Sequence, residues 1–185
     1  MSLTLIAPPA GEPLTLDAVK AHLRVTHTDE DTLITSYLSA ARRTVEARAG
    51  LGVMTQTWRL TLDGQPAGPI RLPLSPVASV LAVSVEAVGG AQTLAAEAYE
   101  TQTGHFARFA PRGVWPAPAI LIGGVQIDFV VGWASAAAVP DDVLQAIRLL
   151  TAHYYEHREA AHTDRLTVTP QAVDALLAPY RQVRL

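Results

Sequence analysis

The sequence predicts an α+β fold, in which N-terminal and C-terminal helices pack as a small bundle and a β-rich segment lies in the middle. Apolar residues recur with the helical period near both ends of the chain and alternate with polar residues in the middle. Most of the 13 prolines lie in that middle third, where they favour short strands and rigid loops. Helices followed by strands and again by helices are typical of α+β chains, not of alternating β/α units.

The N-terminal helices are predicted within residues 14–50. The first ten residues contain Pro8-Pro9 and predict an extended arm. Thr15 is the expected N-cap of a short helix, and Thr28 the expected N-cap of a longer one. Asp29, Glu30 and Asp31 then fall in the first turn, where the helix dipole favours negative charge.

The β-rich segment is predicted over residues 55–133. Its first strand is indicated by Trp58, Leu60 and Leu62, which alternate with polar residues. Further strand character lies at 70–72, 80–85 and 125–131. Residues 95–119 are weakly patterned, so the strand edges and the strand order in this stretch are left open.

The C-terminal helices are predicted over 139–162 and 169–185. Pro140 suits the first position of the longer helix, and Thr169 suits the N-cap of the last one. All these segments together are expected to form one domain, residues 1–185. A chain of this length can bury a substantial core.

Composition excludes several classes of protein. The chain is 49% hydrophobic, so it is not disordered, and it has no cysteine for disulfides, thiol catalysis or thiolate metal sites. No apolar run reaches membrane-spanning length, and no secretion signal is evident. A net charge of −3 argues against a protein that wraps nucleic acid, but not against one past which DNA moves.

One short motif suggests metal chemistry. His153-x-x-Glu156-His157 places two imidazoles four residues apart on the predicted helix, within reach of one zinc ion, with Glu156 as general base. Glu159 and His162 are the candidates for a third ligand. The alternative is structural, because cations are favourable near a helix C-terminus. No catalytic residue, metal or cofactor is predicted, and a small zinc-dependent hydrolase stays as an alternative function.

Other residues point to assembly. Trp115 and Trp133 lie in or next to loops, where aromatic residues serve either as protein–protein contacts or as caps of a core. Arg42 and Arg43 lie on the second helix and are candidates for contact with DNA or an acidic neighbour. The alternative for these arginines is a solvated face paired with Glu46.

The ordered motifs resemble one family, the head–tail connector (adaptor) proteins of long-tailed phages and prophages, in the branch with a β-rich insertion. The resemblance covers residues 14–181. The family includes the connectors of gene-transfer-agent-like particles. The residues that carry it are Leu16-Asp17-x-Val19-Lys20-x-His22-Leu23-Arg24, Asp29-Glu30-Asp31, Ala41-Arg42-x-x-Val45-Glu46, Thr55-Gln56-Thr57-Trp58, Leu72-Pro73-x-x-Pro76-Val77-x-Ser79-Val80, Val131-Gly132-Trp133, Val139-Pro140, His153-Tyr154-Tyr155-Glu156-His157-Arg158-Glu159 and Val173-x-x-Leu176-Leu177-x-Pro179-Tyr180-Arg181.

The resemblance implies a structural, non-enzymatic ring subunit, expected to be a dodecamer. Such a ring docks beneath the portal protein in the particle neck, extends the DNA channel without sequence-specific binding and receives the next connector or tail-completion protein. Assembly in the bacterial cytoplasm is expected, with no membrane partner. A different ring component, such as a tail terminator, is a further alternative.

The resemblance also implies that the C-terminal segment contacts the portal. The expected anchors combine apolar side chains with an aromatic ring and two guanidinium groups, which suit an interface. They are Leu176, Leu177, Tyr180, Arg181 and Arg184. The competing interpretation of this segment is a frayed terminus.

Overall fold

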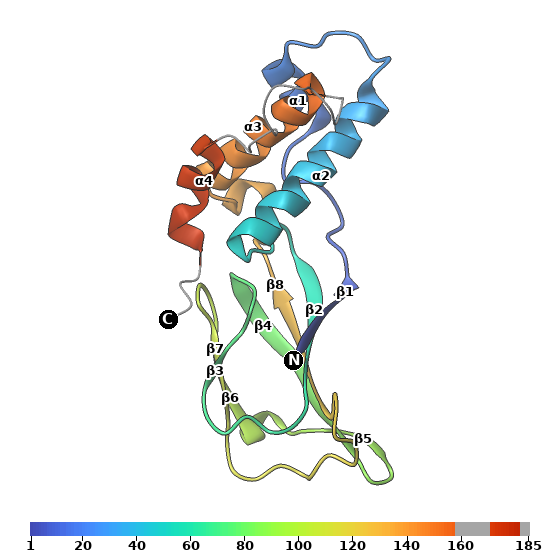
Figure 1. Cartoon of the computed structure of the whole chain (residues 1–185), viewed down its shortest axis with the longest axis vertical. Helices are drawn as coiled ribbons and strands as arrows, with labels where there is room; N and C mark the ends of the chain where they lie inside the picture. Colours follow the sequence, from blue (N-terminus) through green and yellow to red (C-terminus); the bar gives the residue numbers. More distant parts are fainter. Residues whose placement is uncertain (158–170, 182–185) are drawn as a thin grey trace, which may run out of the picture. The chain divides into compact units, whose positions relative to one another are not determined.

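The computed structural model describes residues 1–157 and 171–181, and the chain divides into two compact units (Figure 1). A β unit comprises residues 1–10 and 55–133, and a helical unit comprises residues 11–54 and the described residues from 134 onward. The predicted α+β class is confirmed, with helices flanking a strand-rich middle segment. The single domain over residues 1–185 stays a prediction.

Four helices build the helical unit: α1 (Leu16–Leu23), α2 (Asp31–Ala49), α3 (Asp141–Glu156) and α4 (Gln171–Leu177). Short 3-10 turns lie at Ala136–Ala138 and Ala178–Tyr180. The predicted N-cap of α1 is confirmed, since the Thr15 hydroxyl accepts a hydrogen bond from the Ala18 amide at 3.2 Å.

The helices bury one face each. The helical period of the sequence places the same apolar residues on these faces that are buried in the structure. The buried apolar side chains are Val19, Ile34, Leu38, Ala41, Val45, Ala49, Val143, Ala146, Ile147, Leu150, Val173 and Leu177.

Two predicted helix ends are wrong. Helix α2 begins at Asp31 and not directly after Thr28, because residues 28–30 form a turn in which the Asp31 amide donates to the Thr28 carbonyl. Helix α3 ends at Glu156, short of the predicted residue 162. Residues 158–162 and the predicted cap Thr169 lie outside the described residues.

The β unit contains two antiparallel sheets. The five-stranded sheet has the order β1-β2-β8-β4-β5, and the three-stranded sheet has the order β3-β7-β6. The strands are β1 (Ser2–Ala7), β2 (Gln56–Leu62), β3 (Ile70–Arg71), β4 (Val77–Ala87), β5 (Gly90–Thr93), β6 (Tyr99–Gln102), β7 (Arg108–Pro111) and β8 (Val125–Val131).

The central strand β8 shows why these residues form a sheet with one buried face. Its side chains alternate between buried and half-buried, and the buried ones are Val125, Ile127, Phe129 and Val131. Ile127 pairs with Leu60 of β2 on one side and with Val83 of β4 on the other, and all three are fully buried. The alternation in the sequence therefore set the register of this sheet.

Both sheets contribute to one hydrophobic core. Leu72, Ala107 and Phe109 of the β3–β7 region pack in the same cluster as the buried residues of the large sheet. Strands β6 and β7 lie within residues 95–119, where the strand edges were left open. These strands are only four residues each, and β6 lacks a fully buried side chain, so a period of two had too few positions to be visible.

The N-terminal segment is not a free arm. Residues 2–7 form β1, which pairs antiparallel with β2 from Ser2 opposite Thr61 to Ala7 opposite Thr57. Strand β1 pairs with residues of β2 that lie fifty or more positions further along the chain, so the local sequence could not reveal this pairing. It is the edge strand of the large sheet.

A long loop between β7 and β8 is fixed by hydrogen bonds to its surroundings. The Gln65 side chain accepts from the Trp115 amide and donates to the Gly113 carbonyl, at 3.1 and 2.7 Å. Nearer β8, the Gly123 amide donates to Asp63 Oδ1 at 3.1 Å. The loop is therefore held at both ends although it has no regular structure.

Gly124 is the position at which this loop tolerates least change. A Cβ atom there would lie 2.5 Å from Pro118 Cβ and 3.0 Å from the Ile120 carbonyl oxygen. Because a backbone atom and a proline ring move little, Gly124→Ala is expected to lower the free energy of unfolding by about 1–3 kcal/mol. Urea denaturation would measure the loss. Gly64→Ala is the control, since its Cβ would meet no atom within 4 Å, and equal losses in both variants would contradict this prediction.

Candidate assembly surfaces

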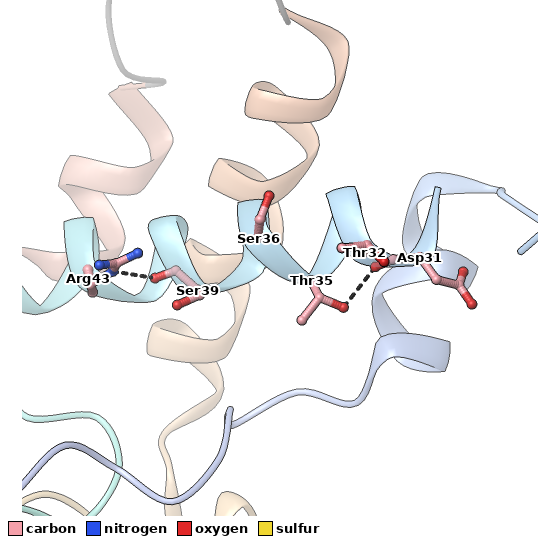
Figure 2. Close-up of a pocket in the computed structure, with 6 residues that line it drawn as sticks. All are labelled: Asp31, Thr32, Thr35, Ser36, Ser39 and Arg43. Carbon is pink, nitrogen blue, oxygen red and sulfur yellow. Dashed lines mark hydrogen bonds between the residues drawn. The ribbon is translucent and has the colours of Figure 1, made fainter. Parts of the chain in front are cut away.

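The outward face of α2 forms a shallow pocket on the helical unit (Figure 2). Asp31 and Arg43 stand at its ends, and short hydroxyl side chains lie between them: Thr32, Thr35, Ser36 and Ser39. The hydroxyls of Thr35 and Ser36 donate to carbonyls of the same helix, and Arg43 Nε donates to the Ser39 carbonyl at 3.4 Å. Asp31 is paired with Lys20 at 2.6 Å, so Arg43 is the exposed charge of this face. A polar face of short hydroxyl side chains suits packing against another protein better than catalysis.

Arg42 does not belong to that face. Its guanidinium lies inside the helical unit, 2.7 Å from Glu12 and 2.7 Å from Glu46, and the residue is only 7% exposed. Burial alone would lower the pKa of Arg42, but the hydrogen bond to Glu12 and the charges of Glu46 and Glu12 raise it above its ordinary value. The predicted Glu46 partner is present, but in a buried ion triad and not on a solvated face, whereas Arg43 is exposed.

The predicted portal-binding residues occupy different environments around α4. Leu177 is fully buried in the helical core, so its side chain stabilises the fold in this conformation. Leu176 and Tyr180 are half-buried and Arg181 is exposed. Arg184 lies outside the described residues.

Asp174 links the end of this segment to α2. Its carboxylate accepts hydrogen bonds from Arg181 and, at 3.0 Å, from Arg48. The hydrogen bond to Arg181 lowers the pKa of Asp174 below its ordinary value, and the charges of Arg181 and Arg48 add to this effect. Burial raises the pKa of Tyr180, as does the charge of Asp142. The end of the described chain is thus ordered by specific contacts.

The two loop tryptophans also differ. Trp115 is 6% exposed, its ring lies 6.1 Å edge-on from Phe109, and its Nε1 donates to the Ala98 carbonyl at 2.9 Å. Trp115 is therefore a cap of the core and not an exposed protein–protein contact. Trp133 is half-buried with its ring 6.0 Å from His105, and its role in an interface stays a prediction.

The histidine motif holds two rings close together. The ring centroids of His153 and His157 are 4.6 Å apart, although His157 has left the helix, and its Nδ1 lies 3.1 Å from the His153 carbonyl oxygen. Within residues 1–157 and 171–181, no three His, Asp or Glu side chains are placed to hold a metal ion. The candidate ligands Glu159 and His162 lie outside these residues.

The pKa of His153 falls below its ordinary value because burial disfavours the charged ring, and the neighbouring His157 adds to this. The unfolded chain therefore binds a proton at His153 more readily than the folded chain does. The free energy of unfolding consequently decreases as the pH falls from the ordinary histidine pKa towards the lower pKa of the folded state. We expect the Tm of the protein to drop less between pH 7.5 and pH 5.5 in His153→Gln than in the unmodified chain. Calorimetry at both pH values measures this, with exposed His22→Gln as control. Equal drops in all three proteins would contradict the assignment.

Among the described residues, no helix combines the length and the apolar character needed to cross a bilayer. Comparison with known proteins then identifies the family. The sequence model of the phage gp6-like head–tail connector protein family matches residues 13–109, which run from just before α1 into β7. The chain belongs to the phage gp6-like head–tail connector family.

Solved structures similar to this connector come from gene transfer agent (GTA) particles. A chain from the neck of an empty GTA particle, computed with C6 symmetry, is 32% identical with a TM-score of 0.82. Chains from the virion of a native GTA particle and from a native neck computed with C12 symmetry are 31% and 30% identical, with TM-scores of 0.82 and 0.79. Each alignment covers 100% of this chain and 97% of the other. No curated protein matches.

Family membership confirms the function that the resemblance implied, a structural head–tail connector subunit of a phage or phage-like particle. The zinc-dependent hydrolase gains no support from the family or from the described geometry. Sequence reasoning missed the α2 face except for Arg43, because small hydroxyl residues carry no pattern of their own that distinguishes an interface from ordinary solvent-exposed helix.

Proposed function

We propose that this connector forms a dodecameric ring in the neck of a phage-like particle, beneath the portal protein. The ring extends the DNA channel, joins head to tail and receives the next connector or tail-completion protein. It acts without enzymatic activity or cofactor and assembles in the bacterial cytoplasm. DNA passes through it without sequence-specific binding.

The observation that carries this proposal is the full-length similarity to a chain from a GTA neck that was computed with C12 symmetry. An alignment over 100% of this chain includes both compact units, so the likeness is not confined to a shared helical motif. A cyclic ring needs two different complementary faces on every subunit. The net charge of −3 agrees with a channel that does not grip DNA.

We propose specific contacts for the two kinds of neighbour. Towards the portal, Leu176, Tyr180 and Arg181 form the contact, extended by Arg184. Towards adjacent subunits, the exposed Arg43 with the α2 face and the half-buried Trp133 contribute. Aromatic and arginine side chains are the residue types that most often dominate such interfaces.

The test is assembly with the portal protein of the same particle. Purified connector mixed with portal should give twelve-fold rings on the portal by electron microscopy. Arg181→Glu is expected to weaken this binding about tenfold, since it removes one arginine from the interface. Arg112→Glu is a matched control, because Arg112 is also exposed and paired with a carboxylate, Glu100, at 2.8 Å. A connector that stays monomeric and ignores the portal would overturn the proposal.

A further inference from the structure

Exposed aliphatic side chains lie along the loop between β7 and β8 and in the turn between β4 and β5. Together we name them the apolar tip: Val88, Val114, Ile120, Leu121 and Ile122. Leu121 and Ile122 are 94% and 82% exposed, values that leave almost nothing of these side chains in contact with their own chain. Aliphatic side chains that stand together in water are a feature of interaction sites.

The apolar tip is held in place by its backbone. The Ala119 amide donates to the Glu86 carbonyl at 2.6 Å, and the Glu86 amide donates to the Gly124 carbonyl at 2.9 Å. These bonds fasten the loop to the end of β4, two residues before Val88 at the turn into β5. Together with the Gln65 and Asp63 contacts, they present the apolar side chains at little further cost in conformational entropy on binding.

The charges around the apolar tip limit what binds there. Residues 113–125 contain no charged side chain. The nearest carboxylates that fix the loop and its neighbours are Asp63 and Glu86, which hydrogen-bond Gly123 and Gln126. The one cation of the loop, Arg112 at its start, is paired with Glu100 at 2.8 Å. Phosphates of nucleic acid would meet no cation at residues 113–125 and two acidic groups beside them, so the partner is an uncharged, apolar protein surface.

The same unit exposes a second apolar surface, which we name the β1 edge patch: Leu5 and Ile6, 41% and 49% exposed. Strand β1 has β2 on one side and is the edge of the sheet. The register of β1 shifts between Leu5 and Ala7, but residues 1–7 carry no charged side chain and no proline, two of the means by which an edge strand avoids pairing with other chains. A strand of this composition is expected to be covered in the assembled state.

The two surfaces cannot cover each other within one subunit. The apolar tip directly precedes β8, where Val125 pairs with Leu62 of β2, whereas Leu5 of the β1 edge patch lies opposite Trp58 of β2. Four residues along an antiparallel strand span about 14 Å. Two different apolar surfaces at separate places on one subunit are what a head-to-tail contact between identical subunits requires.

We propose that the apolar tip of one subunit packs on the β1 edge patch of the next copy of this chain around the ring. This inference rests on the proposed function, since it assigns part of the contact between subunits. It accounts for both exposed surfaces with one repeated interaction. It also gives the N-terminal strand a role in assembly.

The absence of native cysteine allows a direct test. One batch of connector carries Leu121→Cys and another carries Leu5→Cys, and the two are mixed with portal protein and oxidised. The mixture should give a disulfide-linked dimer of one chain of each kind, and neither batch alone should. Replacing the Leu5→Cys batch by one with Thr35→Cys, exposed on α2, should abolish the product.

A charge variant tests the energetics. Leu121→Asp/Ile122→Asp should raise the concentration needed for ring formation about tenfold and leave the Tm of the unassembled protein unchanged, because both side chains are already exposed. Wild-type rings together with an unaffected variant, or cross-links from Leu121→Cys to portal instead of to Leu5→Cys, would overturn this inference alone. Failure of the unmodified chain to form rings would overturn the proposed function first and this inference with it.

Discussion

Replacing Trp115 by alanine is expected to lower the free energy of unfolding by about 3–5 kcal/mol, the range for large aromatic side chains in a packed core. The indole fills the core beside Phe109, and its Nε1 donates to the Ala98 carbonyl, which also accepts from the Arg112 amide at 2.8 Å. Truncation leaves a cavity and removes one of the two hydrogen bonds of this carbonyl. For a chain of this size, the corresponding drop in Tm is about 10 °C, which calorimetry of the unassembled protein would measure.

Trp133→Ala is the matched control, because Trp133 is only half-buried. Its loss should be less than half that of Trp115→Ala, since less apolar area returns to water. A Trp115→Ala protein with unchanged Tm but defective ring assembly would contradict the role of Trp115 in the core. That result would favour the interface role that the sequence left open.

Arg42→Met is expected to destabilise the helical unit by about 3 kcal/mol, because removing one partner of a buried ion pair leaves the remaining charge desolvated. The substitution leaves Glu12 and Glu46, whose side chains are 21% and 12% exposed, as neighbouring carboxylates without their cation. This loss exceeds what the intact pair contributes to stability. Urea denaturation followed by the far-ultraviolet helical signal would measure it.

Two further variants separate charge from packing. Arg43→Met, one residue along the helix but exposed, should change stability by less than about 0.5 kcal/mol. Adding Glu12→Gln and Glu46→Gln to Arg42→Met should recover much of the loss, since neutral amides need no counter-charge. The side-chain amide oxygen introduced by Glu46→Gln can still accept from the Val53 amide, as the carboxylate does. A triple variant as unstable as Arg42→Met would show that the methylene packing of Arg42 matters more than its charge.

Local patterns predicted those elements whose residues repeat often enough. Helix α3 carries Val143, Ile147 and Leu150 on one face, and β8 alternates along its whole length, so the start of α3 and both ends of β8 were predicted within two residues. Helix ends were less accurate, because the turn at Thr28 and the last turn at Glu156 depend on single hydrogen bonds. Strands β6 and β7 are too short for their period to emerge.

The sequence predicted which residue types belong to the candidate site but not whether each side chain is buried or exposed. Arg42 and Arg43 are adjacent and chemically identical in the sequence, yet one is buried between two glutamates and the other is exposed. Glu12 lies thirty residues from Arg42, so no short-range sequence pattern could predict that the two side chains form an ion pair. Leu176 and Leu177 are likewise adjacent, yet Leu176 is half-buried and Leu177 is fully buried.

The sequence by itself determined the α+β class, the order of the helices and of strands β2, β3, β4 and β8, and the connector family, because periodicity and the order of motifs are properties of the chain. Only the tertiary structure decided that residues 2–7 complete the sheet as β1, that Trp115 belongs to the core and that Ile120, Leu121 and Ile122 stand in solvent. The physical reason is that pairing across a sheet and burial in a core are contacts between distant residues, and the free energy of such contacts depends on where the rest of the chain lies.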